Sequence, residues 1–158
     1  MNDEEKADEI EGRRYPRRPI VGVGVVVVRG DRVLLIRRGK PPRQGQWSLP
    51  GGAQELGETV EEAGRREVLE ETGLHLERVA PLTVVDLIDR DEAGEVRFHY
   101  TLVDLVASSV TGEPQAAGDA ADAVWVSFDD AARLPLWNET HRILGMARTR
   151  LHEGLFDE

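Results

Sequence analysis

The sequence of 158 residues contains no cysteine, and this absence excludes several kinds of site. Disulfide frameworks, thiolate metal sites and cysteine nucleophiles are all ruled out. Any bound metal must therefore be held by carboxylate or histidine side chains, and oxygen ligands favour a hard cation.

Long apolar runs are also lacking. The longest, from Ile20 to Val28, is far too short to span a bilayer, and no apolar run follows a positively charged start. We therefore expect a cytoplasmic protein with no membrane partner. Aromatic residues make up only 5% of the chain, but the hydrophobic and charged fractions, 40% and 32%, are those of an ordinary globular domain.

Positive charge is in deficit as well, since the formal net charge is -10. A protein that binds the nucleic-acid backbone needs a basic face to displace counterions, so we expect no nucleic-acid partner. The acids are concentrated in one short segment: Glu55, Glu58, Glu61, Glu62, Glu67, Glu70 and Glu71. Acids crowded in this way in a folded protein require a counter-charge.

The first half of the chain predicts a tail followed by strands. Residues 1–16, which begin with an acidic stretch almost without apolar residues, are expected to be disordered, and residues 17–158 to form a single domain. Two β-branched runs, 20–29 and 32–38, flank a Gly-Asp turn and predict a hairpin. A Pro- and Gly-rich loop follows, and then a short extended segment, 47–49.

A helix is predicted from Thr59 to Thr72, where there is no proline and most residues are good helix formers. Thr59 is suited to cap its first turn with Glu62 three residues later, and Gly73 is a natural stop. The rest of the chain predicts strands at 82–89, 96–107 and 124–127, a polar loop at 112–122, and a helix from Asn138 to about Glu153.

Three glutamates of the first predicted helix, Glu67, Glu70 and Glu71, stand at positions i, i+3 and i+4. This spacing places their carboxylates on one face, where like charges repel by a few tenths of a kcal/mol per pair. Such a group is either a solvated acidic face or a site for Mg²⁺ or Mn²⁺.

The residues around these glutamates favour the metal site. The pattern Gly-x5-Glu-x7-Arg-Glu-U-x-Glu-Glu-x-Gly-U, with U aliphatic, is matched at every defined position. It is formed by Gly52, Glu58, Arg66, Glu67, Val68, Glu70, Glu71, Gly73 and Leu74. The chain thus resembles the Nudix (MutT-like) hydrolase family, and the resemblance runs from the Val-rich first strand to the strand around Trp125.

The resemblance implies an α/β fold, namely an α/β/α sandwich with a mixed sheet and a loop-helix-loop motif. It also implies Mg²⁺ as cofactor, with Mn²⁺ as a substitute, and attack by water on phosphorus. By the family pattern, Glu67, Glu70 and Glu71 bind the metal, while Glu58 binds a second ion or holds the loop through Arg66.

Glu67 is the first candidate for the general base, although some family members use an acid from a loop outside the motif. Gly51 and Gly52 are expected to form a backbone turn whose amides face a phosphate oxygen. Asp119 is preferred to Asp122 as a further metal ligand, but two turn-forming aspartates are an equally good interpretation.

Two further residues are candidates for substrate binding. Arg38 resembles a phosphate-contacting arginine of the family, with a solvent-facing arginine as the alternative. Trp47 is placed to stack on a nucleobase or to pack under the loop.

The overall resemblance is to bacterial ADP-ribose pyrophosphatases, which implies cleavage of ADP-ribose, a small nucleotide, to AMP and ribose 5-phosphate. One departure is that the subfamily's proline about 15 residues after the motif is replaced here by Asp89, Arg90 and Asp91, with Pro81 too early. The alternatives are a MutT-like nucleoside triphosphate pyrophosphohydrolase, for instance for oxidised dGTP, and a domain that binds a nucleotide without hydrolysing it. A homodimer is also consistent with the resemblance.

Overall fold

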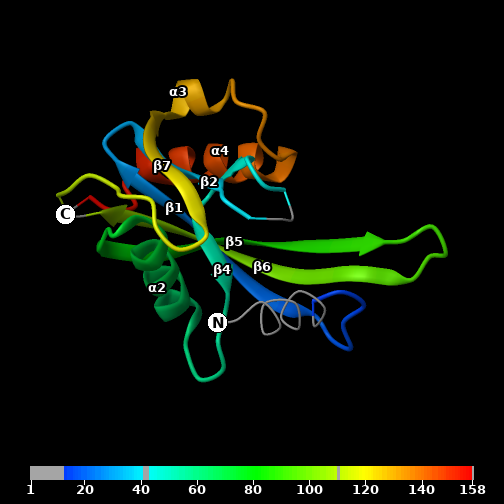
Figure 1. Ribbon diagram of the computed structural model, residues 1–158. Helices are drawn as coiled ribbons and strands as arrows, with labels where there is room; N and C mark the ends of the chain where they lie inside the picture. Colours follow the sequence, from blue (N-terminus) through cyan, green and yellow to red (C-terminus); the bar gives the residue numbers. More distant parts are fainter. Residues whose placement is uncertain (1–12, 41–42, 110, 158) are drawn as a thin grey trace.

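A mixed β-sheet with helices on both faces forms the protein in this computed structural model, which describes residues 13–40, 43–109 and 111–157 (Figure 1). The strands are β1 (Ile20–Arg29), β2 (Arg32–Arg38), β3 (Trp47–Ser48), β4 (Gly51–Ala53), β5 (Leu76–Arg90), β6 (Val96–Ser109) and β7 (Ala120–Ser127). The helices are α2 (Val60–Thr72), α3 (Phe128–Ala131) and α4 (Asn138–His152).

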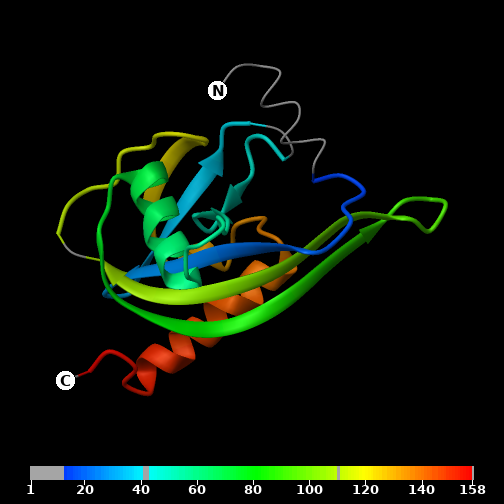
Figure 2. The ribbon, with the colours of Figure 1, turned by 90° about the horizontal axis from the view of Figure 1, so that it is seen from below.

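The sheet runs in the order β3-β2-β1-β6-β5, with β4 paired to β1 and β7 paired to β2. Strands β1 and β6 are parallel, whereas the other pairs are antiparallel. Helix α2 covers one face and α4 the other (Figures 1 and 2). The α/β/α sandwich with a mixed sheet is therefore confirmed.

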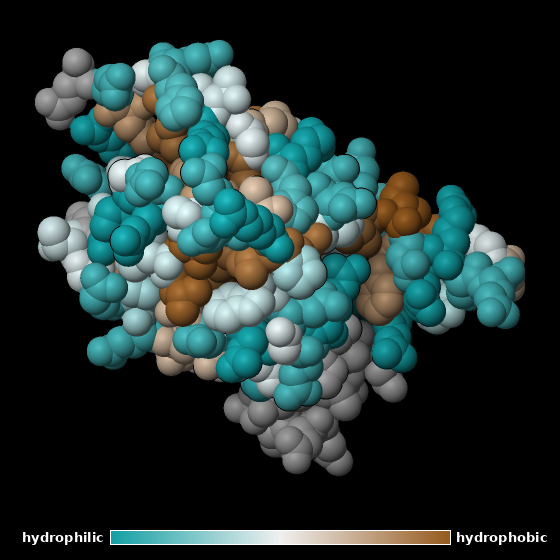
Figure 3. All heavy atoms as spheres, turned by 90° about the horizontal axis from the view of Figure 1, so that it is seen from above, coloured by the Kyte–Doolittle hydropathy of each residue, from teal (hydrophilic) through white to brown (hydrophobic). Residues whose placement is uncertain are grey.

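Two apolar clusters, one on each face of the sheet, make up most of the core. Val23, Val25 and Val27 of β1 face α2, while Val26 and Val28 face α4, because successive residues of a strand point to opposite faces. The Val-rich composition of β1 is thus that of a strand buried on both sides. Figure 3 looks onto the face that carries α3 and α4, where hydrophobic residues form separate patches among hydrophilic ones.

The predicted hairpin of the first two strands is only partly correct. Strands β1 and β2 pair next to their turn, at Val28 with Val33, and then diverge. Strand β4 occupies the place beside the start of β1, so that Gly51 pairs with Gly24. Gly51 and Gly52 are therefore strand residues and not the turn that the sequence predicts. The reason is that β2 diverges from β1, which leaves the start of β1 able to pair with β4.

Strand β5 begins six residues earlier than predicted, because Pro81 does not end it. Proline is tolerated on an edge strand and at a bulge, and β5 is the edge of the sheet with a register shift between Pro81 and Thr83. The β5–β6 hairpin projects beyond the rest of the sheet (Figures 1 and 2), and its Val84 and Ile88 are exposed.

Helix α2 has the predicted caps. The Thr59 hydroxyl accepts a hydrogen bond from the Glu62 amide at 3.0 Å, and Gly73 has a left-handed backbone with φ of 74°. Helix α4 also matches its prediction, with Ile143, Leu144 and Ala147 buried.

Most of the predicted tail, residues 1–12, lies outside the described part of the chain. Within 13–16, the Tyr15 amide donates to the Arg97 carbonyl at 2.8 Å and its hydroxyl donates to Asp91 at 2.8 Å. Among the described residues, no helix is long and apolar enough to cross a membrane.

Candidate active site

Helix α2 carries the predicted glutamates directly over the β4 strand. A Cβ atom added to Gly52 would lie 2.5 Å from the Glu67 carboxyl group, so no larger residue fits at position 52 without moving this side chain. Helix α2 itself approaches the sheet closely at Gly64, where an added Cβ would lie 2.9 Å from Leu105 and 3.1 Å from Val25. The two glycines thus set how near the glutamate side chains lie to the sheet.

Arg66 provides the counter-charge that the acidic segment requires. Its Nη2 and Nε donate to the two oxygens of Glu58 at 2.7 and 3.1 Å, and its Nη1 donates to Glu67 at 2.8 Å. Nη2 also donates to the Ala53 carbonyl at 3.1 Å, which ties α2 to the end of β4. The hydrogen bonds from Arg66 hold the pKa of Glu58 below its usual range.

Glu71 is the most buried acid of the site, with only 5% of its surface exposed. Its Oε1 accepts a hydrogen bond from the Gly51 amide at 3.2 Å, whereas its buried Oε2 has no hydrogen-bond partner in the described part of the chain. Burial, and then the neighbouring Glu67 carboxyl within hydrogen-bonding reach, raises the pKa of Glu71 to about 9. The Gly51 amide opposes this shift and the charge of Asp119 adds to it.

These groups fit a hard divalent cation. The buried Glu71 carboxylate has an oxygen without a hydrogen-bond partner among the described residues and lies next to Glu67, so two negative charges there are unfavourable unless one carboxyl group binds a proton. A bound cation can take the place of that proton and stabilise both carboxylates. The donor atoms are carboxylate oxygens, which are the ligands that Mg²⁺ prefers.

The predicted ligand set is nevertheless not assembled at one point. Within residues 13–40, 43–109 and 111–157, no three His, Asp or Glu side chains converge as a ready metal cluster. Glu70 is turned toward Arg66 at 3.4 Å, and its side chain is 55% exposed. For Glu70 to join Glu67 and Glu71 as a ligand of the same cation, its side chain has to turn away from Arg66.

Asp119 lies near this site, in the loop that precedes β7. The loop is fastened to the end of α2, because the Ala117 amide donates to the Glu71 carbonyl at 3.0 Å. The Asp119 carboxylate is 2.8 Å from the Lys40 ammonium, and its backbone carbonyl accepts from Gly39 at 2.9 Å. Asp122, in contrast, is a residue of β7 whose carboxylate accepts from the Ala123 amide at 2.8 Å.

A hollow of about 130 Å³ lies at the other end of the β3–β4 segment. It is lined by Arg38, Arg43, Gln46, Trp47, Ser48, Trp137 and Thr140. The predicted substrate residues Arg38 and Trp47 are thus brought together, and the Arg38 backbone is held by hydrogen bonds to Gln46 at 2.9 Å and Gly45 at 2.7 Å.

The sequence did not point to Trp137 and Thr140 as lining residues. They lie about 90 residues after Trp47 along the chain and enter the site only because the start of α4 packs beside β3. The available sequence signal was a tryptophan directly before the predicted helix, and in the structure 38% of Trp137 remains exposed.

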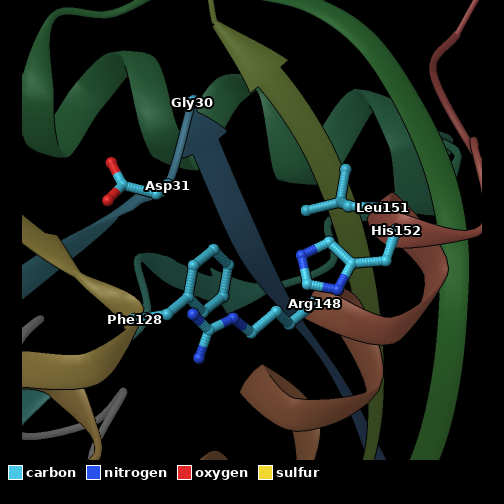
Figure 4. Close-up of a pocket in the computed structure, with 6 residues that line it drawn as sticks. All are labelled: Gly30, Asp31, Phe128, Arg148, Leu151 and His152. Carbon is cyan, nitrogen blue, oxygen red and sulfur yellow. The ribbon is translucent and has the colours of Figure 1, made fainter.

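A second hollow, of about 150 Å³, lies at the opposite end of α4 and is lined by Gly30, Asp31, Phe128, Arg148, Leu151 and His152 (Figure 4). Its arginine is already engaged, since Arg148 lies over the Phe128 ring at 5.5 Å and pairs with Asp129 at 3.0 Å. None of the predicted site residues lines this hollow.

Comparison with known proteins points in the same direction as the sequence motif. A family model described as the NUDIX domain matches residues 18–145. An ADP-ribose pyrophosphatase of Methanocaldococcus jannaschii is 34% identical over 134 residues, which are 85% of this chain and 77% of that protein. An oxidized purine nucleoside triphosphate hydrolase of Danio rerio is 30% identical over 150 residues, 84% of this chain and 88% of that protein.

Solved structures of the same kind share the fold. The crystal structure of a MutT NUDIX hydrolase from Burkholderia pseudomallei superposes with a TM-score of 0.70 at 38% identity. The match covers 82% of this chain and 98% of that one.

Proposed function

This chain belongs to the Nudix family of hydrolases, which act on phosphorus-containing anhydrides, and we propose that it cleaves the diphosphate bond of ADP-ribose to give AMP and ribose 5-phosphate. Members of the family generally use a divalent metal, and we propose Mg²⁺ here. The observation that carries the proposal is the pair formed by the partly exposed Glu67, beside Gly52, and the buried Glu71, whose Oε2 has no hydrogen-bond partner among the described residues.

Glu67, Glu70 and Glu71 hold the cation, with Asp119 as a further ligand. When bound, the cation neutralises the diphosphate and lowers the pKa of the attacking water. The carboxylate chemistry of these residues and the burial of Glu71 support this assignment. Asp119 already acts on the Glu71 pKa through its charge, which supports its place beside the other ligands.

Glu67 takes the proton of the attacking water on its carboxylate. Arg66 orients Glu67 and Glu58 through its hydrogen bonds, so that the guanidinium holds the Glu67 side chain beside β4. Glu58, held below its usual pKa, remains charged and anchors Arg66 from the loop before the helix.

The substrate lies along the β3–β4 segment, which has the hollow at one end and the glutamates at the other. Trp47 and Ser48 line the hollow, whereas Gly51 and Gly52 lie against Glu71 and Glu67. The nucleobase occupies the hollow beside Trp47, and the diphosphate lies over the two glycines, with Arg38 as a contact for a phosphate oxygen. This layout suits a nucleotide with its anhydride bond a short distance from the base.

The second candidate is hydrolysis of an oxidised purine nucleoside triphosphate. The Danio rerio relative supports it, since it matches 84% of this chain. The replacement of the subfamily's proline by Asp89, Arg90 and Asp91 also weakens the case for ADP-ribose.

Assaying the purified protein with Mg²⁺ against ADP-ribose and against 8-oxo-dGTP, in parallel, tests the proposal. We expect the protein to turn over ADP-ribose faster than 8-oxo-dGTP, so that AMP and ribose 5-phosphate are the main products of the two parallel assays. Rapid release of pyrophosphate from 8-oxo-dGTP without turnover of ADP-ribose would reject ADP-ribose in favour of the second candidate.

A further inference from the structure

Arg43, in the loop between β2 and β3, has a backbone conformation that is unusual for its residue type. Its φ of 62° lies in the left-handed region, which among the described residues other than glycine only Tyr15 shares. A Cβ atom makes this conformation unfavourable, whereas glycine adopts it without steric cost. Backbone strain of this kind is concentrated at positions that bind ligands, so the Arg43 side chain calls for a function.

The loop that contains Arg43 is closed by backbone hydrogen bonds. The Arg38 amide donates to the Gln46 carbonyl at 2.9 Å, and the Gly45 amide donates to the Arg38 carbonyl at 2.7 Å. The Gln46 amide donates to the Arg43 carbonyl at 3.1 Å, which closes a tight turn over residues 43–46. Arg43 is thus presented from a turn that is fastened to the end of β2.

This turn brings Arg43 to the hollow of about 130 Å³ described above. Arg43 lines the hollow together with Arg38, Trp47 and Trp137. Arg43 is exposed, so its guanidinium group is accessible to a ligand that enters from solvent. The strained residue therefore belongs to the wall of a cavity and not to an isolated surface turn.

The charge of the hollow is opposite to that of the whole molecule. Two arginines line it and none of the described residues that line it is acidic, although the formal net charge of the protein is -10. Guanidinium groups donate paired hydrogen bonds to phosphate oxygens, and the faces of Trp47 and Trp137 suit a planar ring. The hollow thus suits a ligand that joins a planar ring to an anionic group.

We propose that Arg43 is a specificity-determining residue that binds the 5′-phosphate of a nucleotide whose base lies beside Trp47. The inference rests on the proposed function for the location of the nucleobase. The Arg43 guanidinium donates hydrogen bonds to the phosphate nearest the base, and Arg38 supplies a second cation for the same group. Arg43 therefore lets the protein distinguish a nucleotide from the nucleoside that lacks the phosphate.

The test compares AMP with adenosine, whose binding is measured by calorimetry without metal. We expect Arg43→Ala to weaken the binding of AMP by about tenfold, as for a hydrogen bond to a charged group, and to change that of adenosine by less than about twofold. Arg43→Gly, in which the left-handed backbone is unstrained, should show the same selective loss, and Arg43→Lys should recover part of the affinity for AMP.

The matched control is Arg32→Ala, which removes a positive charge from the exposed first residue of β2, outside the hollow. It should leave the binding of both compounds unchanged. The same loss of AMP binding in Arg32→Ala as in Arg43→Ala would overturn the inference, because net charge and not a contact of Arg43 would then be responsible.

Other outcomes separate this inference from the proposed reaction. Equal weakening of AMP and adenosine by the Arg43 variants, unchanged binding of AMP, or no binding of AMP by the wild type would overturn the inference. If Arg43→Ala hydrolyses ADP-ribose with the KM of the wild type, the reaction stands and the inference is rejected. Since calorimetry needs no turnover, a protein that fails to hydrolyse ADP-ribose but keeps an Arg43-dependent preference for AMP would reject the reaction and retain the inference.

Discussion

Single residues of the site differ in how their charges are balanced. Arg66 neutralises Glu58 and Glu67 through short hydrogen bonds, while Glu71 is buried and keeps one oxygen unpartnered within the described residues. The two situations predict different outcomes for mutation. Loss of the arginine would leave charges unpaired, whereas loss of the Glu71 carboxylate removes an unfavourable buried acid and, with it, a proposed metal ligand.

Glu71→Gln should therefore separate function from stability. We expect turnover to fall by roughly 10²-fold or more, because a ligand of the cation is lost, while the free energy of unfolding stays equal or rises. Steady-state kinetics and urea denaturation measure the two quantities. Glu62→Gln, on the exposed side of the first turn of the same helix, is the matched control and should leave turnover unchanged. An unchanged rate in Glu71→Gln would remove this residue from the metal site.

Asp104 makes the stability of the protein depend on pH. Its pKa is raised by burial to about 7 from a usual value of 3.8, so the folded state holds its proton more tightly than the unfolded state. The stabilising contribution is complete below the unfolded pKa and is lost as the pH rises through the folded pKa. Compared with Asp104→Asn, the wild type should thus lose about 2–3 kcal/mol between pH 5 and pH 8.

Urea denaturation of both proteins at the two pH values measures this difference, because the remaining titrating groups are shared and cancel. A difference in unfolding free energy that stays constant with pH would mean that Asp104 is not the group that titrates.

At the scale of elements, the approach of α2 to the sheet determines the position of every glutamate in the site. The helix packs through Ala63 and Gly64, both buried, against Val25 and Leu105. Its end is fastened to the Asp119 loop through the Glu71 and Thr72 carbonyls, which accept from Ala117 and Gln115. A helix held in this way presents its carboxylates rigidly, as a metal site requires.

Two glycines in helices offer a matched comparison of this packing. Gly145, in α4, has nothing within 4 Å of an added Cβ, so Gly145→Ala should raise the unfolding free energy by about 0.5–1 kcal/mol through helix propensity. Gly64→Ala makes the same chemical change against Leu105 and Val25 and should lower it by about 1–3 kcal/mol. It should also reduce turnover, because the helix moves away from β4. Equal stabilisation by both substitutions, measured by urea denaturation, would contradict the close packing of α2.

For the whole molecule, the proposed metal site joins segments that are distant in the sequence. Glu67 and Glu71 come from α2, Gly52 comes from β4, and Asp119 comes from the loop before β7. A cation that binds only the folded arrangement stabilises the entire domain by mass action. Metal binding and folding are therefore coupled.

Thermal unfolding should report this coupling. With Mg²⁺ at ten times its dissociation constant, we expect a gain of about 1.4 kcal/mol and a rise in Tm of roughly 3–6 °C, which EDTA reverses. Glu71→Gln should reduce the rise, while Glu62→Gln should retain it. A rise of the same size in Glu71→Gln would place the stabilising ion elsewhere in the protein.

Local features were predictable because they depend on neighbouring residues. Thr59 and Gly73 capped α2 as expected, and the period of Ile143, Leu144 and Ala147 located α4. The extra length of β5 was not predictable, since Pro81 ends a strand in isolation and is tolerated only at the sheet edge.

The sequence by itself determined the family, the α/β class and the helical glutamates of the hydrolase motif, because these depend on spacing along one continuous segment. Only the tertiary structure decided that Gly51 and Gly52 form a strand, that Trp137 and Thr140 meet Trp47, and that Asp104 is buried without a partner for its Oδ2 among the described residues. The physical reason is that pairing edges, shared cavities and burial are set by segments far apart in the chain. Their packing is absent from any local pattern of residues.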